Sequence, residues 1–252
     1  MVPQGLPLQI NMSLLLGVIR LGKKNAVVKK LDSVEALGSA SVICTDKTGT
    51  LTRNEMNIVS AFGADFDMKI KGKGYLPTGK ILVDEEALNA NHHNQLNDFF
   101  NALYFNNNAR LCEPDAEHSS YYVIGDPTEG ALRVLGKRIG IDVESFEENF
   151  VQIDGLPFDS DRKMMSSIYQ SNTDKKNMTT FTKGATESVL LNCKYVRNLK
   201  TGKNEKITEA QKKEILAKTA AFAEKAYRVL SIAQKIMPKK SEYTNENVES
   251  DL

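Results

Sequence analysis

The feature that most constrains the fold of this chain is a short apolar run that ends abruptly in a charged, hydroxyl-rich loop. Residues 41–45 read SVICT, and residues 46–52 read DKTGTLT. β-Branched residues favour strands, and a glycine such as Gly49 can supply a tight turn. The pattern predicts a buried strand that ends in a polar loop with a carboxylate at its start.

The residue types in this loop suit phosphoryl transfer. The Asp46 carboxylate could attack a phosphoryl group and form an aspartyl-phosphate. Lys47, the Thr48 hydroxyl and backbone N–H groups could then stabilise the three phosphoryl oxygens. A lone aspartate after a strand is usually an ordinary turn residue, so the prediction depends on the complete string of seven residues.

Composition excludes several other classes of protein. The 252 residues fit one or two domains with a real core. Lys and Arg total 33 and Asp and Glu total 32, which gives a net charge of +1, so we expect no nucleic-acid partner. The three cysteines, Cys44, Cys112 and Cys193, form no CxxC pair and indicate neither a disulfide scaffold nor a zinc cluster.

One apolar segment lies near the start of the chain. No run reaches the roughly 18–20 apolar residues of a complete membrane span. Residues 6–21 are apolar but interrupted by polar side chains, and they predict an amphipathic or half-length helix that ends near Gly22. The lysines that follow, Lys23, Lys24, Lys29 and Lys30, indicate either a solvated turn or the cytoplasmic flank of a membrane helix.

The rest of the chain alternates between strand-like and helix-like patterns. We expect strands at 56–62, 66–70, 121–124, 151–153, 164–169, 178–182 and 229–236, and helices at 84–105, 128–139 and 208–227. This mixture predicts an α/β and α+β protein.

Several motifs together resemble one family. DKTGTLT resembles the phosphorylation motif of the P-type cation ATPases, and VPQGLP at 2–7 is similar to a turn in the fourth transmembrane helix of the type II, calcium-pump-like members. GDPTEGAL, PFDSDRKMMS, FTKGATE and YRVLSIA follow in the family's order and resemble its nucleotide-binding motifs. The resemblance extends over nearly the whole chain.

The resemblance implies four segments. Residues 1–22 would be the cytoplasmic half of a transmembrane helix, and 23–53 the start of a haloacid-dehalogenase-like Rossmann phosphorylation domain. Residues 54–240 would be an inserted nucleotide-binding domain, an antiparallel sheet with flanking helices. Residues 241–252 would begin a truncated return to the phosphorylation domain. No TGD or GDGxND motif is present, so the chain resembles a fragment of a multi-pass membrane pump, mostly cytoplasmic in this region.

The resemblance also assigns roles in phosphorylation. Asp46 resembles the phosphorylated aspartate, and Lys47 and Thr48 resemble the neighbours that contact phosphate. Asp46 and the Thr48 carbonyl would face Mg²⁺, in a metal site that lacks its further carboxylates.

A second set of residues resembles the family's ATP-binding residues, namely Glu129, Phe158, Lys183 and Arg228. Phe158 offers a face for adenine stacking, and Arg228 can fork onto phosphate oxygens. Lys183 lies next to Gly184, where the backbone can approach a ligand closely. Each residue alone has an ordinary core or surface interpretation, so the prediction depends on their joint order.

Two positions depart from the calcium-pump pattern. Ser160 stands where an arginine often contacts nucleotide phosphate. Gln4 stands where calcium-pump-like members carry a glutamate that binds the transported cation. Gln4 keeps an oxygen and loses the charge that a hard divalent cation prefers, so calcium is not implied as the transported ion.

Three functional readings remain open from the sequence. The first is part of an ATP-driven cation pump, and the isolated chain is then expected to be inactive as an enzyme. The partners would be ATP and the missing half of the pump, together with the transported cation and membrane lipid, which the parent protein would contact. The second is a remnant that only binds ATP. The third is a soluble phosphatase of the haloacid-dehalogenase class, which the nucleotide-binding motifs disfavour.

Overall fold

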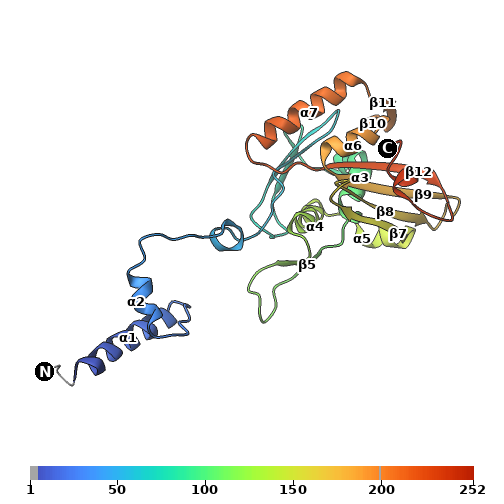
Figure 1. Cartoon of the computed structure of the whole chain (residues 1–252). Coiled ribbons are helices and arrows are strands. Elements are labelled where there is room, and N and C mark those ends of the chain that lie inside the picture. The colour runs from blue at the N-terminus through green and yellow to red at the C-terminus, as the bar shows by residue number, and fades with distance from the viewer. Residues whose placement is uncertain (1–4, 199) are drawn as a thin grey trace. The chain divides into compact units, whose positions relative to one another are not determined.

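The computed structural model describes residues 5–198 and 200–252, and the chain divides into two compact units, Met1–Arg53 and Asn54–Leu252. The first unit contains the helices α1 (Leu6–Gly22) and α2 (Ser33–Gly38) and a turn at Lys47–Leu51, in which Thr48 and Gly49 have non-helical backbone angles (Figure 1). Gly17 of α1 lies against Val34 of α2, which is how the two helices contact each other.

The predicted helix at 6–21 corresponds to α1. Pro7 lies in its first turn, and the Lys23 N–H closes its end by donating to the Ile19 carbonyl at 3.1 Å. Within residues 5–198 and 200–252, the structure contains no helix with both the length and the apolar character needed to cross a membrane.

The prediction of a buried strand at 41–45 is wrong. These residues are exposed and belong to no strand among the residues that the structure describes. Strand propensity only expresses how well a side chain suits a pleated, half-buried surface, and a strand also needs a partner for its backbone groups. The described part of the chain offers residues 41–45 no such partner.

The second unit contains two four-stranded antiparallel sheets. The first has the order β1 (Ser60–Phe62), β2 (Asp67–Lys71), β3 (Lys80–Val83) and β4 (Glu86–Ala87). Alternation along β2 buries Met68 and Ile70 and exposes the residues between them. The long helix α7 (Glu209–Ala223) contacts this sheet, since the Phe62 and Phe222 rings stack at 6.0 Å between centroids.

The larger sheet positions the candidate site. Its strands are β7 (Phe150–Asp159), β8 (Met164–Ser171), β9 (Asn177–Gly184) and β12 (Ser231–Pro238), in the order β12-β9-β8-β7 (Figure 1). The β8 residues Met164 to Tyr169 are all buried, because both faces of the sheet are covered.

Different helices cover the two faces of the larger sheet. Tyr169 and Phe181 pack against α3 (Ala90–Phe105) and α4 (Pro127–Ile139) on one face. Ile168, the neighbour of Tyr169 on β8, points to the opposite face and packs against Val248 of α8 (Asn245–Val248). Residues 241–252 therefore lie within the second unit and pack on the sheet, and their assignment as the start of a return to the phosphorylation domain stays a prediction.

The remaining elements were not all anticipated. The expected strand at 121–124 is β6 (Tyr122–Ile124), paired with β5 (Arg110–Cys112). The expected helix at 84–105 begins only at Ala90, because Glu86–Ala87 pairs with β3 as strand β4. Among the elements that the sequence did not predict are α5 (Val143–Asn149), α6 (Thr186–Asn192) and the hairpin of β10 (Tyr195–Asn198) and β11 (Lys203–Lys206). These are short elements whose patterns are too brief to distinguish from loops.

Candidate functional site

The start of α4 fixes one side of the site. Asp126 caps this helix by accepting from the Thr128 N–H at 2.8 Å and the Glu129 N–H at 3.2 Å, and Pro127 occupies the first turn. Gly130 allows the helix to lie against Val123 of β6, because a Cβ there would come within 2.5 Å of that side chain. The GDPTEG sequence therefore sets the position of the Glu129 side chain.

Lys183 and Glu129 form a buried ion pair. Lys183 lies near the end of β9, and its Nζ donates to Glu129 Oε1 at 2.6 Å. The two side chains are only 6% and 14% exposed, so the charges depend on each other rather than on water. The structure thus brings together two of the four residues that the sequence assigns to ATP.

Three consecutive asparagines after α3 support this pair. Lys183 Nζ also donates to the Asn106 carbonyl, while the Asn107 side chain donates to the Glu129 carbonyl at 2.8 Å. The Asn108 N–H reaches Glu129 Oε2 at 3.3 Å. Sequence reasoning missed this turn, although a run of three asparagines directly after an apolar helix was a visible signal.

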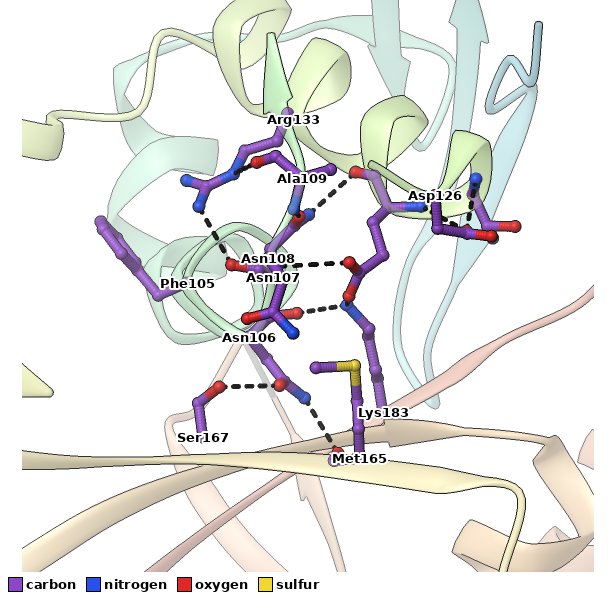
Figure 2. Close-up of polar contacts among 12 residues, drawn as sticks. Phe105, Asn106, Asn107, Asn108, Ala109, Asp126, Arg133, Met165, Ser167 and Lys183 are labelled. Carbon is purple, nitrogen blue, oxygen red and sulfur yellow. Dashed lines mark hydrogen bonds and ion pairs between the residues drawn. The ribbon is translucent and has the colours of Figure 1, made fainter. Parts of the chain in front are cut away.

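Asn106 is itself fully buried between α3 and β8. Its amide donates to the Met165 carbonyl at 3.1 Å and accepts from Ser167 Oγ at 2.9 Å (Figure 2). These bonds fix the carbonyl that receives the Lys183 ammonium, so the ammonium is held from two directions.

The electrostatics of Lys183 reflect two opposing causes. Burial lowers its pKa below the ordinary 10.5, because a desolvated ammonium is disfavoured, while the hydrogen bond and charge of Glu129 act to raise that pKa. Burial is the stronger cause. Lys183 is therefore a cation whose charge depends on Glu129.

Phe158 lies on the same sheet and is 62% exposed. On β7, Leu156 pairs with Ser166 and Asp159 pairs with Met164, so two residues of β7, Pro157 and Phe158, oppose Met165 alone. Met165 pairs with Lys183 on its other side. An exposed aromatic ring and the buried ammonium therefore flank the same β8 position.

Arg228 joins the site through α4. Its Nη1 donates to the Thr128 hydroxyl at 2.8 Å, one residue before Glu129. Arg228 is exposed, in the segment between α7 and β12. The four predicted ATP residues thus lie on connected elements of the second unit.

Gly184 permits a close approach at the end of β9. A Cβ at this position would lie 2.3 Å from the Lys163 carbonyl oxygen, which accepts from the Ala185 N–H at 2.9 Å. The glycine after Lys183 is therefore required by the neighbouring backbone, apart from any contact with a ligand.

The Asp46 loop belongs to the first unit. Asp46 Oδ1 accepts from the Lys47 N–H at 2.6 Å, and Gly49 adopts a left-handed φ of +77°. Asp46, Lys47 and Thr48 are all exposed. The Asp46 carboxylate and the Thr48 carbonyl are hard oxygen donors of the type that Mg²⁺ prefers, but they supply only two ligands. Gln4 lies outside the described residues.

Comparison with known proteins identifies this mixed α/β module. A family model described as P-type ATPase, cytoplasmic domain N, matches residues 95–252. The chain therefore belongs to the P-type ATPase family, which confirms the resemblance seen in the sequence. The antiparallel sheets with flanking helices are consistent with domain N, whereas the Rossmann phosphorylation domain stays a prediction.

Relatives in several organisms match almost the whole chain. The chain is 37% identical over 250 residues to calcium-transporting ATPase 1 of Bacillus cereus (99% of this chain, 24% of the relative). It is 33% identical over 235 residues to calcium-transporting ATPase type 2C member 1 of Bos taurus (92% and 23%). It is also 33% identical over 239 residues to cation-transporting ATPase pma1 of Synechocystis (93% and 25%). The chain thus spans about a quarter of the length of these relatives.

Proposed function

We propose that this chain binds ATP on the face of the second unit that carries Glu129, Phe158, Lys183 and Arg228. We further propose that it is part of an ATP-driven cation pump in which Asp46 accepts the γ-phosphoryl group. The observation that carries the ATP site is the buried Lys183–Glu129 pair at 2.6 Å, beside an exposed aromatic ring.

The Lys183 ammonium suits a nucleotide contact because it has three N–H donors. Glu129 Oε1 and the Asn106 carbonyl take two of them, which leaves the third for a ligand oxygen. The ion pair holds that donor in a single orientation, so little side-chain entropy is lost when ATP binds.

The other two residues would hold the two ends of the nucleotide. Adenine would stack on the Phe158 ring. This contact would stabilise the complex because the base covers an exposed apolar surface. The Arg228 guanidinium would bind phosphate oxygens through N–H groups other than the one that donates to Thr128.

Phosphoryl transfer would take place at Asp46. A carboxylate oxygen of Asp46 forms a bond to the γ-phosphorus while the bond from that phosphorus to the bridging oxygen of ADP breaks, and ADP leaves with the electron pair. A water oxygen would later bond to the phosphorus while the bond from that phosphorus to the Asp46 oxygen breaks, which releases inorganic phosphate and regenerates the carboxylate. Mg²⁺, held in part by the Asp46 and Thr48 oxygens, would neutralise the phosphate charge.

The parent protein would carry the transport function. The relatives are named as calcium-transporting and cation-transporting ATPases. We propose that a longer parent protein containing this chain transports a cation across a membrane. Gln4, as a neutral oxygen ligand, is our candidate for a contact with the transported cation.

A module that only binds ATP is the second candidate function. The exposure of Asp46 and the absence of any strand at 41–45 among the described residues favour it for the chain taken alone. The two candidates share the ATP site and differ only in whether Asp46 becomes phosphorylated.

Replacing Phe158 or Lys183 by alanine should weaken ATP binding to the full chain by about 1–2 kcal/mol each, which is roughly 5- to 30-fold in Kd. The first change removes stacking and the second a charge-assisted contact. Isothermal titration calorimetry with ATP measures both losses.

Tyr195→Ala and Lys206→Ala are matched controls, because they remove an exposed aromatic ring and an exposed ammonium on the β10–β11 hairpin. Both should leave the Kd for ATP unchanged. An unchanged Kd in both site variants would refute the proposed ATP site.

A further inference from the structure

We propose that Glu249 is a positioning residue for nucleotide binding, acting through Arg162 on the turn that carries Phe158. The inference rests on the proposed ATP site and assigns a role to two residues outside it. The geometry of five hydrogen bonds around Arg162 and Glu249 and the burial of Glu249 support it.

Arg162 bonds to the residue on each side of Phe158. Its Nη2 donates to the Pro157 carbonyl at 2.6 Å, and its backbone N–H donates to Asp159 Oδ1 at 3.0 Å. The Arg162 N–H, together with the Asp161 N–H, donates to the Asp159 carboxylate and keeps the pKa of that carboxyl below its usual range. Since the Phe158 ring is 62% exposed, its orientation depends on this backbone more than on packing of the ring itself.

Glu249 fixes the Arg162 guanidinium from the other side. Arg162 Nη1 lies 2.5 Å from Glu249 Oε1 and 2.6 Å from Oε2. Ser166 Oγ also donates to Oε1, at 2.9 Å. Glu249 is only 3% exposed, so its charge is fully engaged with these donors.

The segment around Glu249 is anchored to the sheet independently of Arg162. Val248 is fully buried against Ile168 and Met178, and Lys235 Nζ donates to the carbonyls of Asn247 and Ser250. Glu249 is thus a fixed carboxylate rather than a mobile surface group. A rigid anchor is what a positioning residue needs to transmit order to a second group.

The effect should be specific to the adenine end of the nucleotide. Glu249 and Ser166 lie on the face of the sheet that α8 covers, and Glu249 is linked to the Phe158 turn through the Arg162 guanidinium, which bonds to the Pro157 carbonyl. Lys183 is held from the opposite face, by Glu129 and Asn106. Loss of the Glu249 charge should therefore disturb base stacking and leave phosphate binding unchanged.

The test compares ATP with inorganic tripolyphosphate, which carries the phosphates without the base, on the full chain. Glu249→Gln should bind ATP about tenfold more weakly than the unmodified chain while tripolyphosphate binding changes by less than about twofold. Arg162→Lys should show the same split, because a lysine cannot contact Glu249 and the Pro157 carbonyl with one planar group. Asp251→Asn is the control, because it removes the negative charge of the nearby exposed Lys194–Asp251 pair. It should change the affinity for neither ATP nor tripolyphosphate.

A reciprocal measurement needs no variant. If Glu249 couples the Phe158 turn to residues 244–252, saturating ATP should slow amide hydrogen exchange in 244–252, and tripolyphosphate should not. This readout holds even if Glu249→Gln fails to fold.

The outcomes separate this inference from the ATP site on which it rests. If the unmodified chain binds ATP and folded Glu249→Gln binds it equally well, the role of Glu249 is refuted alone. Equal losses for ATP and tripolyphosphate, or exchange in 244–252 that ATP does not slow, also refute it. If the unmodified chain fails to bind ATP, the proposed site and this inference fail together.

Discussion

Incubated with radiolabelled ATP and Mg²⁺, this 252-residue chain should yield no acid-stable, hydroxylamine-labile phosphoenzyme. The proposed nucleophile, Asp46, is exposed, and residues 41–45 before it pair with no strand in the described part of the chain. Phosphoryl transfer depends almost entirely on positioning and on metal charge. A carboxylate that is not held in position loses the benefit of positioning and of the metal charge.

The expected size of this effect follows from the loss of positioning. Effective-molarity advantages of well-oriented groups reach about 7 kcal/mol or more, so their loss slows transfer by about 10⁵-fold. Acid precipitation after incubation measures the label, and Asp46→Asn sets the blank. A hydroxylamine-sensitive signal above that blank would show that the chain assembles a working site, for example with a second polypeptide.

Glu129→Gln should lower the free energy of unfolding by about 3 kcal/mol at neutral pH, because it leaves the Lys183 cation buried without its counter-charge. The double variant Glu129→Gln, Lys183→Met should regain most of this loss, since no unpaired charge then remains. Urea unfolding of the unmodified chain, the two single variants and the double variant gives a double-mutant cycle. Glu85→Gln, at the exposed Lys69–Glu85 pair, should leave stability unchanged.

The pH dependence of this loss has a defined sign. Burial holds the pKa of folded Lys183 below 10.5, so between that lowered pKa and 10.5 the unfolded chain binds more protons and stability rises with pH. Removal of the Glu129 charge removes the largest of the causes that raise this pKa, and the rise in stability then begins at a lower pH. The gap between Glu129→Gln and the unmodified chain should therefore narrow in the alkaline range. A gap that widens there would contradict the buried pair.

Long periodic elements could be predicted from the sequence. The expected strands at 164–169 and 178–182 lie within β8 and β9, and the expected helix at 128–139 corresponds to α4, whose Asp126 cap and Gly140 stop are visible in the sequence. The strand at 41–45 failed because its side chains favour a strand but its backbone finds no partner in the described chain. Strand propensity belongs to a single residue, whereas a strand forms only when two segments pair through their backbones.

For the proposed ATP site, the sequence indicated individual residues and not their contacts. Their order indicated Glu129, Phe158, Lys183 and Arg228, but no pattern in the sequence indicated that Lys183 and Glu129 are paired, 54 positions apart. The Asn106 carbonyl and the Arg162–Glu249 contact were missed for the same reason, since both join segments far apart in the chain. Such contacts arise from sheet register and helix packing.

The most direct test of the ATP site is an NMR titration of the full chain with ATP, followed by backbone amide shifts. We predict that the largest shifts fall on Phe158, Lys183, Arg228 and the α4 residues around Glu129, and that Phe158→Ala reduces them at a given ATP concentration. Shifts that concentrate elsewhere, for instance on the β10–β11 hairpin, would contradict the proposed site.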